Sequence, residues 1–287
     1  MKSNKINFIC LGAPKSGTTS LFHYLKGNPE VQMPFEKELH YFNAEDFDPD
    51  KVDVYHNNYF DNFEGLKGKV ASRYFVNDLV PERLYNYNPD LKLIVIMREP
   101  VERAFSHYKM IKRIDEISLT LDDVLYKESS EKSFNKIKER VLGNSLYYSN
   151  IKKYLDFFPI ENFHFMFLEE LEANPHFEME KLYSFLNINS RSKVDVTKKH
   201  FESKDGKFFN RLVPVLSKFK PLQLIWNSFP KKTKTKILHF YNTNIKTLGT
   251  KKETLSISEK KKYRKIFSND ISSLNNIVSV PWKEYNG

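Results

Sequence analysis

The chain has 287 residues, 40% hydrophobic and 29% charged, and this balance excludes a disordered protein. Its net charge of +10 favours an anionic partner or reflects a basic surface that is simply solvated. The single cysteine, Cys10, excludes an intramolecular disulfide and a cysteine-based zinc cluster.

The N-terminal apolar run, "NFICL", is too short for a signal peptide, and the chain has no apolar run near the roughly 18 residues that span a bilayer. We therefore expect a cytoplasmic protein. No stretch rich in Gly, Ser or Pro divides the chain, which predicts one domain over residues 1–287.

Three apolar runs hardly alternate with polar residues and are predicted to be buried parallel strands: residues 7–11, 91–97 and 163–168. Helical patterns follow at residues 18–29, 99–113, 145–159, 177–188 and 256–278, the last with Ser258 as its expected N-cap. Strands that alternate with helices indicate an α/β fold with a central parallel β-sheet flanked by helices.

The first loop, "GAPKSGTT" at residues 12–19, connects a predicted strand to a predicted helix. Such a turn directs several backbone N–H groups and a helix dipole at one point, which suits an anion, although a tight turn without a ligand is the alternative. A nucleotide hydrolase would have lysine where Thr18 stands, and the only lysine here is Lys15. Because Arg98 rather than aspartate follows the second strand, we expect an anion site without a metal.

Three ordered segments resemble sulfotransferases that use 3′-phosphoadenosine 5′-phosphosulfate (PAPS). "PKSGTTSL" at residues 14–21 resembles their 5′-phosphosulfate loop, and "LKLIVIMREPVERAFSHY" at 91–108 resembles their 3′-phosphate element. "KELHYF" at 37–42 is similar to the [KE]-E-x-H-[FY]-F segment of the heparan-sulfate and carbohydrate branch. The resemblance runs from about residue 7 to 190, and more weakly to 210, and implies a P-loop-type three-layer fold.

The resemblance also implies roles for individual residues. Glu38 would be the general base, His40 a second polar contact to the acceptor, and Lys15 the cation at the leaving group. The implied donor-binding residues are Lys15, Ser16, Gly17, Thr18, Thr19, Ser20, Arg98, Ser106, Tyr147, Lys204, Gly206 and Lys207. In isolation, residues 35–43 are more typical of a solvated loop, and it is the order of the motifs that favours the base. His40 could equally be structural, and residues 202–209 could be a surface turn. Arg103 could join the 3′-phosphate site, but a surface pair with Glu99 is favoured.

One segment departs from the branch. Where the branch has G-E-K-[ST]-P-x-Y, residues 68–75 read "GKVASRYF", which puts Val70 at the position of the lysine. Either Lys69 or Arg73 substitutes for that lysine, or the second cation is missing.

The predicted function is transfer of a sulfuryl group from PAPS to a hydroxyl or amine of a carbohydrate or other small acceptor, which releases PAP. The acceptor could be acidic, and its pocket is expected around residues 43–62 and 113–140. The alternatives are a magnesium-dependent P-loop kinase or nucleotide hydrolase, and a basic nucleic-acid-binding protein supported only by the charge and by "KKTKTK" at residues 231–236. The prediction includes no nucleic-acid partner and no membrane span, and it leaves the oligomeric state open.

Overall fold

A computed structural model describes residues 5–60, 63–115, 117–189, 195–196 and 253–285. Nearly all of them belong to one compact unit formed by residues 1–200 and 256–287. The predicted loop at residues 202–209 and the basic turn at 231–236 lie outside the described residues. A single domain over the whole chain therefore stays a prediction.

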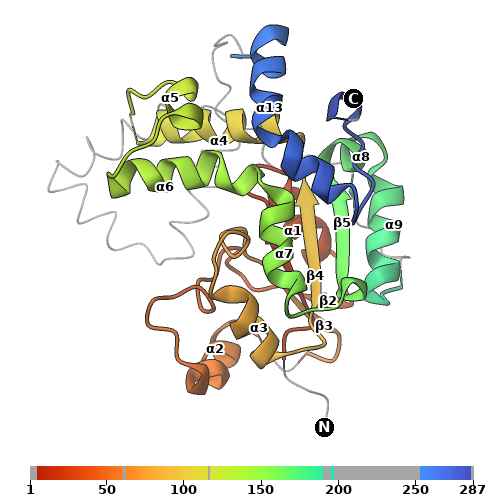
Figure 1. Cartoon of the computed structure of the whole chain (residues 1–287). Coiled ribbons are helices and arrows are strands. Elements are labelled where there is room, and N and C mark those ends of the chain that lie inside the picture. The colour runs from red at the N-terminus through yellow and green to blue at the C-terminus, as the bar shows by residue number, and fades with distance from the viewer. Residues whose placement is uncertain (1–4, 61–62, 116, 190–194, 197–252, 286–287) are drawn as a thin grey trace, which may run out of the picture. The chain divides into compact units, whose positions relative to one another are not determined.

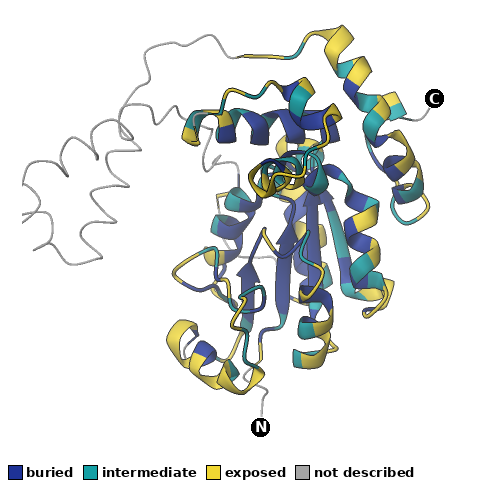
Figure 2. Cartoon of the chain, turned by 60° about the vertical axis from the view of Figure 1, so that its left-hand side comes forward, coloured by how far each residue is buried: buried dark blue, intermediate teal, exposed yellow. Residues whose placement is uncertain are grey.

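The unit is built on a parallel sheet of five strands in the order β2-β3-β1-β4-β5 (Figure 1). The strands are β1 (Phe8–Gly12), β2 (Val31–Gln32), β3 (Leu66–Val70), β4 (Lys92–Met97) and β5 (Phe163–Phe167). Every residue of β1 is buried, as is every residue of β4 after Lys92, and Figure 2 shows both strands in the interior. The predicted central parallel sheet is confirmed.

Two strands were not predicted, and β3 shows why. Its sequence, "LKGKV", contains two lysines and a glycine, so it lacks the apolar run of a buried strand. Gly68 stands opposite Phe8 of β1, and a Cβ at position 68 would lie 1.9 Å from Phe8 Cζ. Packing between strands, rather than local sequence, therefore determines this element.

Helices surround the sheet on both faces (Figure 1). They are α1 (Thr18–Lys26), α2 (Val52–Tyr59), α3 (Val80–Tyr87), α4 (Pro100–Ile114), α5 (Leu121–Tyr126), α6 (Lys132–Val141), α7 (Tyr147–Leu155), α8 (Leu168–Ala173), α9 (Pro175–Leu186) and α13 (Ile257–Leu274). Short 3₁₀ turns lie at Pro49–Lys51, Gly143–Ser145, Ile160–Asn162 and Lys283–Tyr285. On one face, apolar residues of α1 and α9 pack with those of β1, β4 and β5 to form a hydrophobic core. Helix α7 covers the other face (Figure 1).

The N-cap of the C-terminal helix, α13, lies two residues earlier than predicted, at Ser256. Ser256 Oγ accepts a hydrogen bond from Glu259 N at 3.2 Å, and the Glu259 carboxylate accepts one from Ser256 N at 2.8 Å. This is a capping box, so the prediction of Ser258 as the N-cap is wrong. The apolar face of the predicted helix is buried as expected: Tyr263, Phe267, Ile271 and Leu274. Among the described residues, no helix has the length and apolar character needed to cross a membrane.

Candidate functional site

The first loop lies at the carboxyl end of β1, where it turns into α1. Its backbone enters the left-handed region at Lys15 (φ 72°) and again at Gly17 (φ 93°). A side chain at position 17 would place its Cβ 2.7 Å from Leu168 Cδ1, so glycine also meets a steric need there. Ala13 N donates to Ile96 O at 2.7 Å, which ties the loop to β4. A backbone of this form can direct N–H groups at one point, although Ser16 N already donates to Ala13 O at 3.3 Å. An anion held by the loop stays a prediction.

The loop side chains that are predicted to bind PAPS differ in their exposure to solvent. Ser16 and Thr18 are buried, whereas Lys15, Thr19 and Ser20 are partly exposed. Thr18, Thr19 and Ser20 form the first turn of α1, whose N–H groups have no partner within the helix. The beginning of α1 therefore presents backbone N–H groups that have no partner within the helix, together with the hydroxyl groups of Thr18 and Thr19, and this combination suits a phosphate.

Lys15 lies in a strongly positive environment. Its Nζ is 3.8 Å from Met110 Sδ of α4. Burial lowers the pKa of Lys15, and the positive charges of four further side chains lower it more: Arg113, Arg98, Arg103 and Lys37. Cations that converge in this way repel one another unless an anion lies between them. Arg98 thus lies near enough to lower the pKa of Lys15, and an anion bound near these cations would relieve their repulsion.

Arg98 follows β4 and is held from two directions. Tyr147, fully buried, donates its phenol hydrogen to Arg98 O at 2.6 Å and accepts a hydrogen bond from Arg98 N at 3.3 Å. The guanidinium group pairs with Glu102 at 3.3 Å and stays 27% exposed. Ser106 lies two turns into α4 and is partly exposed. Tyr147 therefore positions the backbone of Arg98. The predicted contact between Tyr147 and PAPS stays a prediction.

Arg103 is not on the surface, so its predicted surface pair with Glu99 is wrong. Its side chain is fully buried, and it donates to Ser145 Oγ at 2.5 Å, to Pro14 O at 3.4 Å and to Val141 O. Burial lowers the pKa of Arg103 to about 10. Glu99 is unavailable because it is the N-cap of α4, where its carboxylate accepts from Glu102 N at 2.7 Å. Arg103 therefore connects the loop at Pro14 to the end of α6.

The predicted base, Glu38, lies beside the loop. Its carboxylate accepts two hydrogen bonds from Ser72, one from the backbone N at 3.0 Å and one from Oγ at 2.7 Å. Lys37 Nζ is 3.0 Å from Glu38 Oε1 and donates to Thr18 Oγ1 at 3.1 Å. Lys37 therefore connects the phosphate loop at residues 14–21 directly to the segment at residues 37–42. His40, in contrast, is exposed, with its Nδ1 3.3 Å from Asn43 Oδ1.

Lys37 and Ser72 were missed as site residues. Lys37 is part of the quoted segment "KELHYF", but its side chain could not be placed without the loop it contacts. Ser72 lies in the segment that departs from the branch, which gave no reason to select it. Lys204, Gly206 and Lys207 lie outside the described residues, so their predicted contacts stay predictions.

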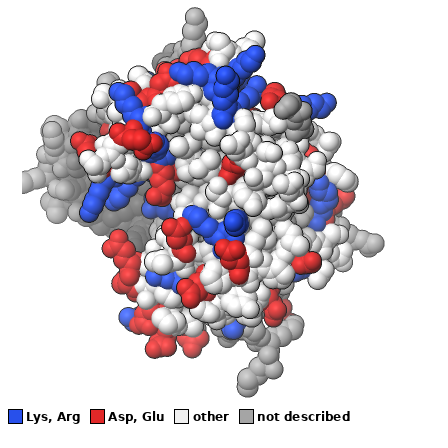
Figure 3. Space-filling view, viewed as in Figure 1, with Lys and Arg blue, Asp and Glu red and all other residues white. Residues whose placement is uncertain are grey.

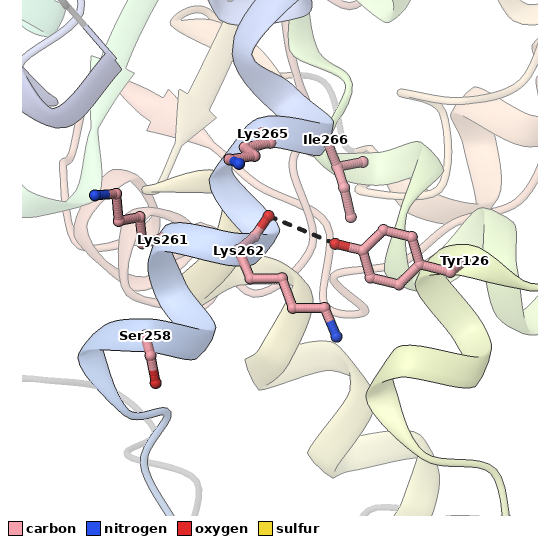
Figure 4. A pocket seen from close by; sticks show the side chains of 6 residues that line it. All are labelled: Tyr126, Ser258, Lys261, Lys262, Lys265 and Ile266. Atoms are coloured by element: carbon pink, nitrogen blue, oxygen red, sulfur yellow. Dashed lines mark hydrogen bonds between the residues drawn. The ribbon is translucent and has the colours of Figure 1, made fainter.

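Two further features of the described residues bear on ligands. These residues contain no group of three or more His, Cys, Asp or Glu side chains that could hold a metal ion. A surface hollow of about 560 Å³ lies between α5 and α13 (Figure 4), lined by Tyr126, Ser258, Lys261, Lys262, Lys265 and Ile266. Lysine and arginine side chains gather over α13 (Figure 3). Of the predicted donor and base residues that the structure describes, none lines this hollow.

Comparison with known proteins places the chain in a family. A family model described as a sulfotransferase domain matches residues 5–216. The chain is 27% identical over 195 residues to mouse heparan sulfate glucosamine 3-O-sulfotransferase 5, a match that covers 64% of this chain and 54% of the mouse protein. It is 24% identical over 200 residues to a Caenorhabditis briggsae bifunctional heparan sulfate N-deacetylase/N-sulfotransferase 1, covering 65% and 23%. The chain thus spans about half the length, or less, of these curated relatives.

A solved structure supports the same assignment. The fold matches a sulfotransferase from Alicyclobacillus acidocaldarius with a TM-score of 0.58 and 26% identity, over 76% of this chain and 92% of that one. The phosphate loop, Glu38 and Arg98 all lie inside the region that the family model covers. The chain therefore belongs to the sulfotransferase domain family.

Proposed function

We propose that the chain transfers a sulfuryl group from PAPS to a hydroxyl or amine of a glycan or other small acceptor and releases PAP. The observation that carries this proposal is the contact between the two motifs. Lys37 connects Thr18 of the loop to Glu38, so a base lies beside an anion site that is rich in cations. Family membership supports the same reaction, and the heparan sulfate enzymes among the relatives favour an acidic glycan as the acceptor.

The residues fit the donor by the charge that they present. The loop N–H groups with Thr18 and Thr19 would hold the 5′-phosphate, and Arg98 with Ser106 would hold the 3′-phosphate. PAPS supplies the activated sulfuryl group. Glu38 would accept the proton of the acceptor as its oxygen attacks, because hydroxyl groups are poor nucleophiles until a base assists. Lys15 would stabilise the negative charge that develops at the leaving group.

The alternatives have less support. A magnesium-dependent kinase or hydrolase would use a lysine at position 18, where the chain has Thr18. A nucleic-acid-binding protein would not need a base beside the phosphate loop. We therefore rank both below sulfuryl transfer.

The test is transfer of labelled sulfate from [35S]PAPS to heparan sulfate, with phenols, alcohols and lipids as further acceptors. We expect label in at least one acceptor. The variant Glu38→Gln should lower kcat by about 10²–10⁴-fold, the usual contribution of a general base, while PAP affinity stays unchanged. Glu36→Gln is a matched control, because Glu36 is an exposed carboxylate two residues away.

Two outcomes would count against the proposal in different ways. If Glu38→Gln kept the wild-type kcat, Glu38 would not be the base. If the wild-type protein transferred no label and bound neither PAP nor PAPS, the proposed reaction itself would be wrong.

A further inference from the structure

The family's second lysine is absent from its expected place. Val70 occupies that position, fully buried at the end of β3 and opposite Cys10 of β1. A sulfuryl group in transfer carries negative charge on its outer oxygens, and a cation beside them lowers the barrier. Some other residue must therefore supply this cation, or the protein works without it.

Lys69 does not supply the cation. Its side chain is fully buried, and its Nζ donates to Tyr74 OH at 2.5 Å. The same amine lies 4.5 Å from the Tyr74 ring centroid and 5.2 Å from that of Tyr55. Burial holds the pKa of Lys69 well below its ordinary value. The Lys69 amine therefore lies in a cluster of aromatic side chains that includes Tyr55 and Tyr74.

Tyr74 explains what Lys69 does there. The Tyr74 hydroxyl accepts from Phe42 N at 3.1 Å and donates to Leu39 O at 3.0 Å. These bonds fix the backbone on the C-terminal side of Glu38. Arg73, the other predicted substitute, is exposed in the turn that follows β3.

Lys37 places its amine between the phosphate loop and the predicted base, where a sulfuryl group would be transferred. Its Nζ lies 3.1 Å from Thr18 Oγ1 and 3.0 Å from Glu38 Oε1, and its side chain is 21% exposed. Thr18 directly follows Gly17, at the position where a nucleotide hydrolase has its lysine. A separate segment thus brings an amine to the loop at that point.

We propose that Lys37 is a catalytic residue that replaces the lysine lost at Val70 and binds the outer oxygens of the sulfuryl group. This inference rests on the proposed function. In the proposed reaction Thr18 would contact the leaving phosphate and Glu38 the acceptor, so an amine that touches both side chains would lie beside the sulfur between them. The acceptor oxygen forms its bond to sulfur, and its proton goes to Glu38. The bond between sulfur and the bridging oxygen breaks, and its electron pair leaves with PAP.

The test separates contact with the sulfuryl group from contact with the rest of the donor. PAP and PAPS affinities are measured by calorimetry for the wild type, Lys37→Ala, Lys37→Arg and Arg73→Ala. We expect Lys37→Ala to keep PAP affinity within about twofold but to lower the PAPS-to-PAP affinity ratio by about tenfold, as for one hydrogen bond to a charged group. Lys37→Arg should restore part of the ratio, and the exposed control Arg73→Ala should leave it unchanged.

A second measurement excludes an effect exerted only through Glu38. The affinity ratio is compared between Glu38→Gln and the double variant Glu38→Gln, Lys37→Ala. We expect the ratio to fall again in the double variant, because the lysine contacts the donor itself. In single turnovers with [35S]PAPS and an acceptor of the wild type, Lys37→Ala should lose about 10²–10³-fold in rate, the cost of one donor to developing charge.

The proposal is overturned if Lys37→Ala weakens PAP and PAPS equally, if it changes neither affinity, or if Arg73→Ala has the larger effect on the ratio. A wild-type protein that binds neither ligand would instead contradict the proposed function. The two failures are therefore distinguishable.

Discussion

Lys15 shows how a lysine inside a phosphate loop can differ from one at its end. The left-handed backbone at Lys15 turns its side chain toward α4, where its Nζ meets Met110. Burial and the nearby cations lower its pKa. A bound anion would reverse part of this shift, because opposite charge favours the ammonium form. The side chain is therefore best suited to a site that holds an anion.

The pH dependence of donor use tests this reading of Lys15. The amine is charged below its pKa, and this pKa lies under the ordinary value of 10.5 in the free protein. Donor use should therefore be lost as the pH rises through the lowered pKa. We expect the alkaline limb of kcat/KM for PAPS, which reports the free enzyme, to lie below pH 10.5.

The variant Lys15→Arg should move this limb to higher pH, since arginine stays protonated to a pKa above about 12. Lys26→Arg, on an exposed residue at the end of α1, is the control and should leave the limb in place. An alkaline limb that does not move in Lys15→Arg would show that another group controls it.

Short motifs in the sequence are enough to select the loop residues, Glu38 and Arg98, whose roles stay predictions. Contacts between distant residues could not be predicted in this way. Ser72 lies 34 residues from Glu38, so nothing in either segment alone reveals their hydrogen bonds. Arg103 was misread because its spacing from Glu99 fits a helix, whereas Glu99 lies outside α4 and is its cap. Spacing along the sequence cannot show whether a side chain such as Glu99 already has another hydrogen-bond partner.

At the scale of elements, α13 holds the beginning of α7. Asp270 of α13 accepts hydrogen bonds from Tyr148 N at 2.9 Å and Ser149 N at 3.0 Å, and from Ser149 Oγ at 2.7 Å. The N-cap residue of α7, Leu146, makes no side-chain cap hydrogen bond. The buried Asp270 carboxylate, 122 residues along the chain from Tyr148, therefore caps the beginning of α7 from another helix and complements the helix dipole.

Removal of this cap should destabilise the protein measurably. We expect Asp270→Ala to lower the free energy of unfolding by about 2 kcal/mol or more, because two backbone N–H groups lose a charged acceptor. Urea unfolding followed by circular dichroism measures the change. The control Asp122→Ala removes a half-exposed ion pair with Lys262 on the same helix and should have a much smaller effect. Equal effects of the two variants would contradict the assigned cap.

At the scale of the whole molecule, the central parallel sheet was predictable from the apolar runs of β1, β4 and β5, whereas β2 and β3 were not predicted. The three predicted strands hardly alternate between apolar and polar residues, because helices cover both faces of the sheet (Figure 1). β3 was missed because Lys69 and Gly68 are fitted to Tyr74 and Phe8, which only the folded chain brings near. The acceptor pocket expected at residues 43–62 and 113–140 stays a prediction, as do the cytoplasmic location and the single domain.

The central claim is that the loop around Lys15 is a PAPS site that works without a metal. The most direct measurement is a calorimetric titration of the protein with PAP in the presence of a chelator, compared with a titration with Mg-ATP. We predict that PAP binds without a divalent cation and more tightly than Mg-ATP, and that Arg98→Ala weakens PAP binding through loss of its contact with the 3′-phosphate. Failure to bind PAP, or tighter binding of Mg-ATP, would contradict the account.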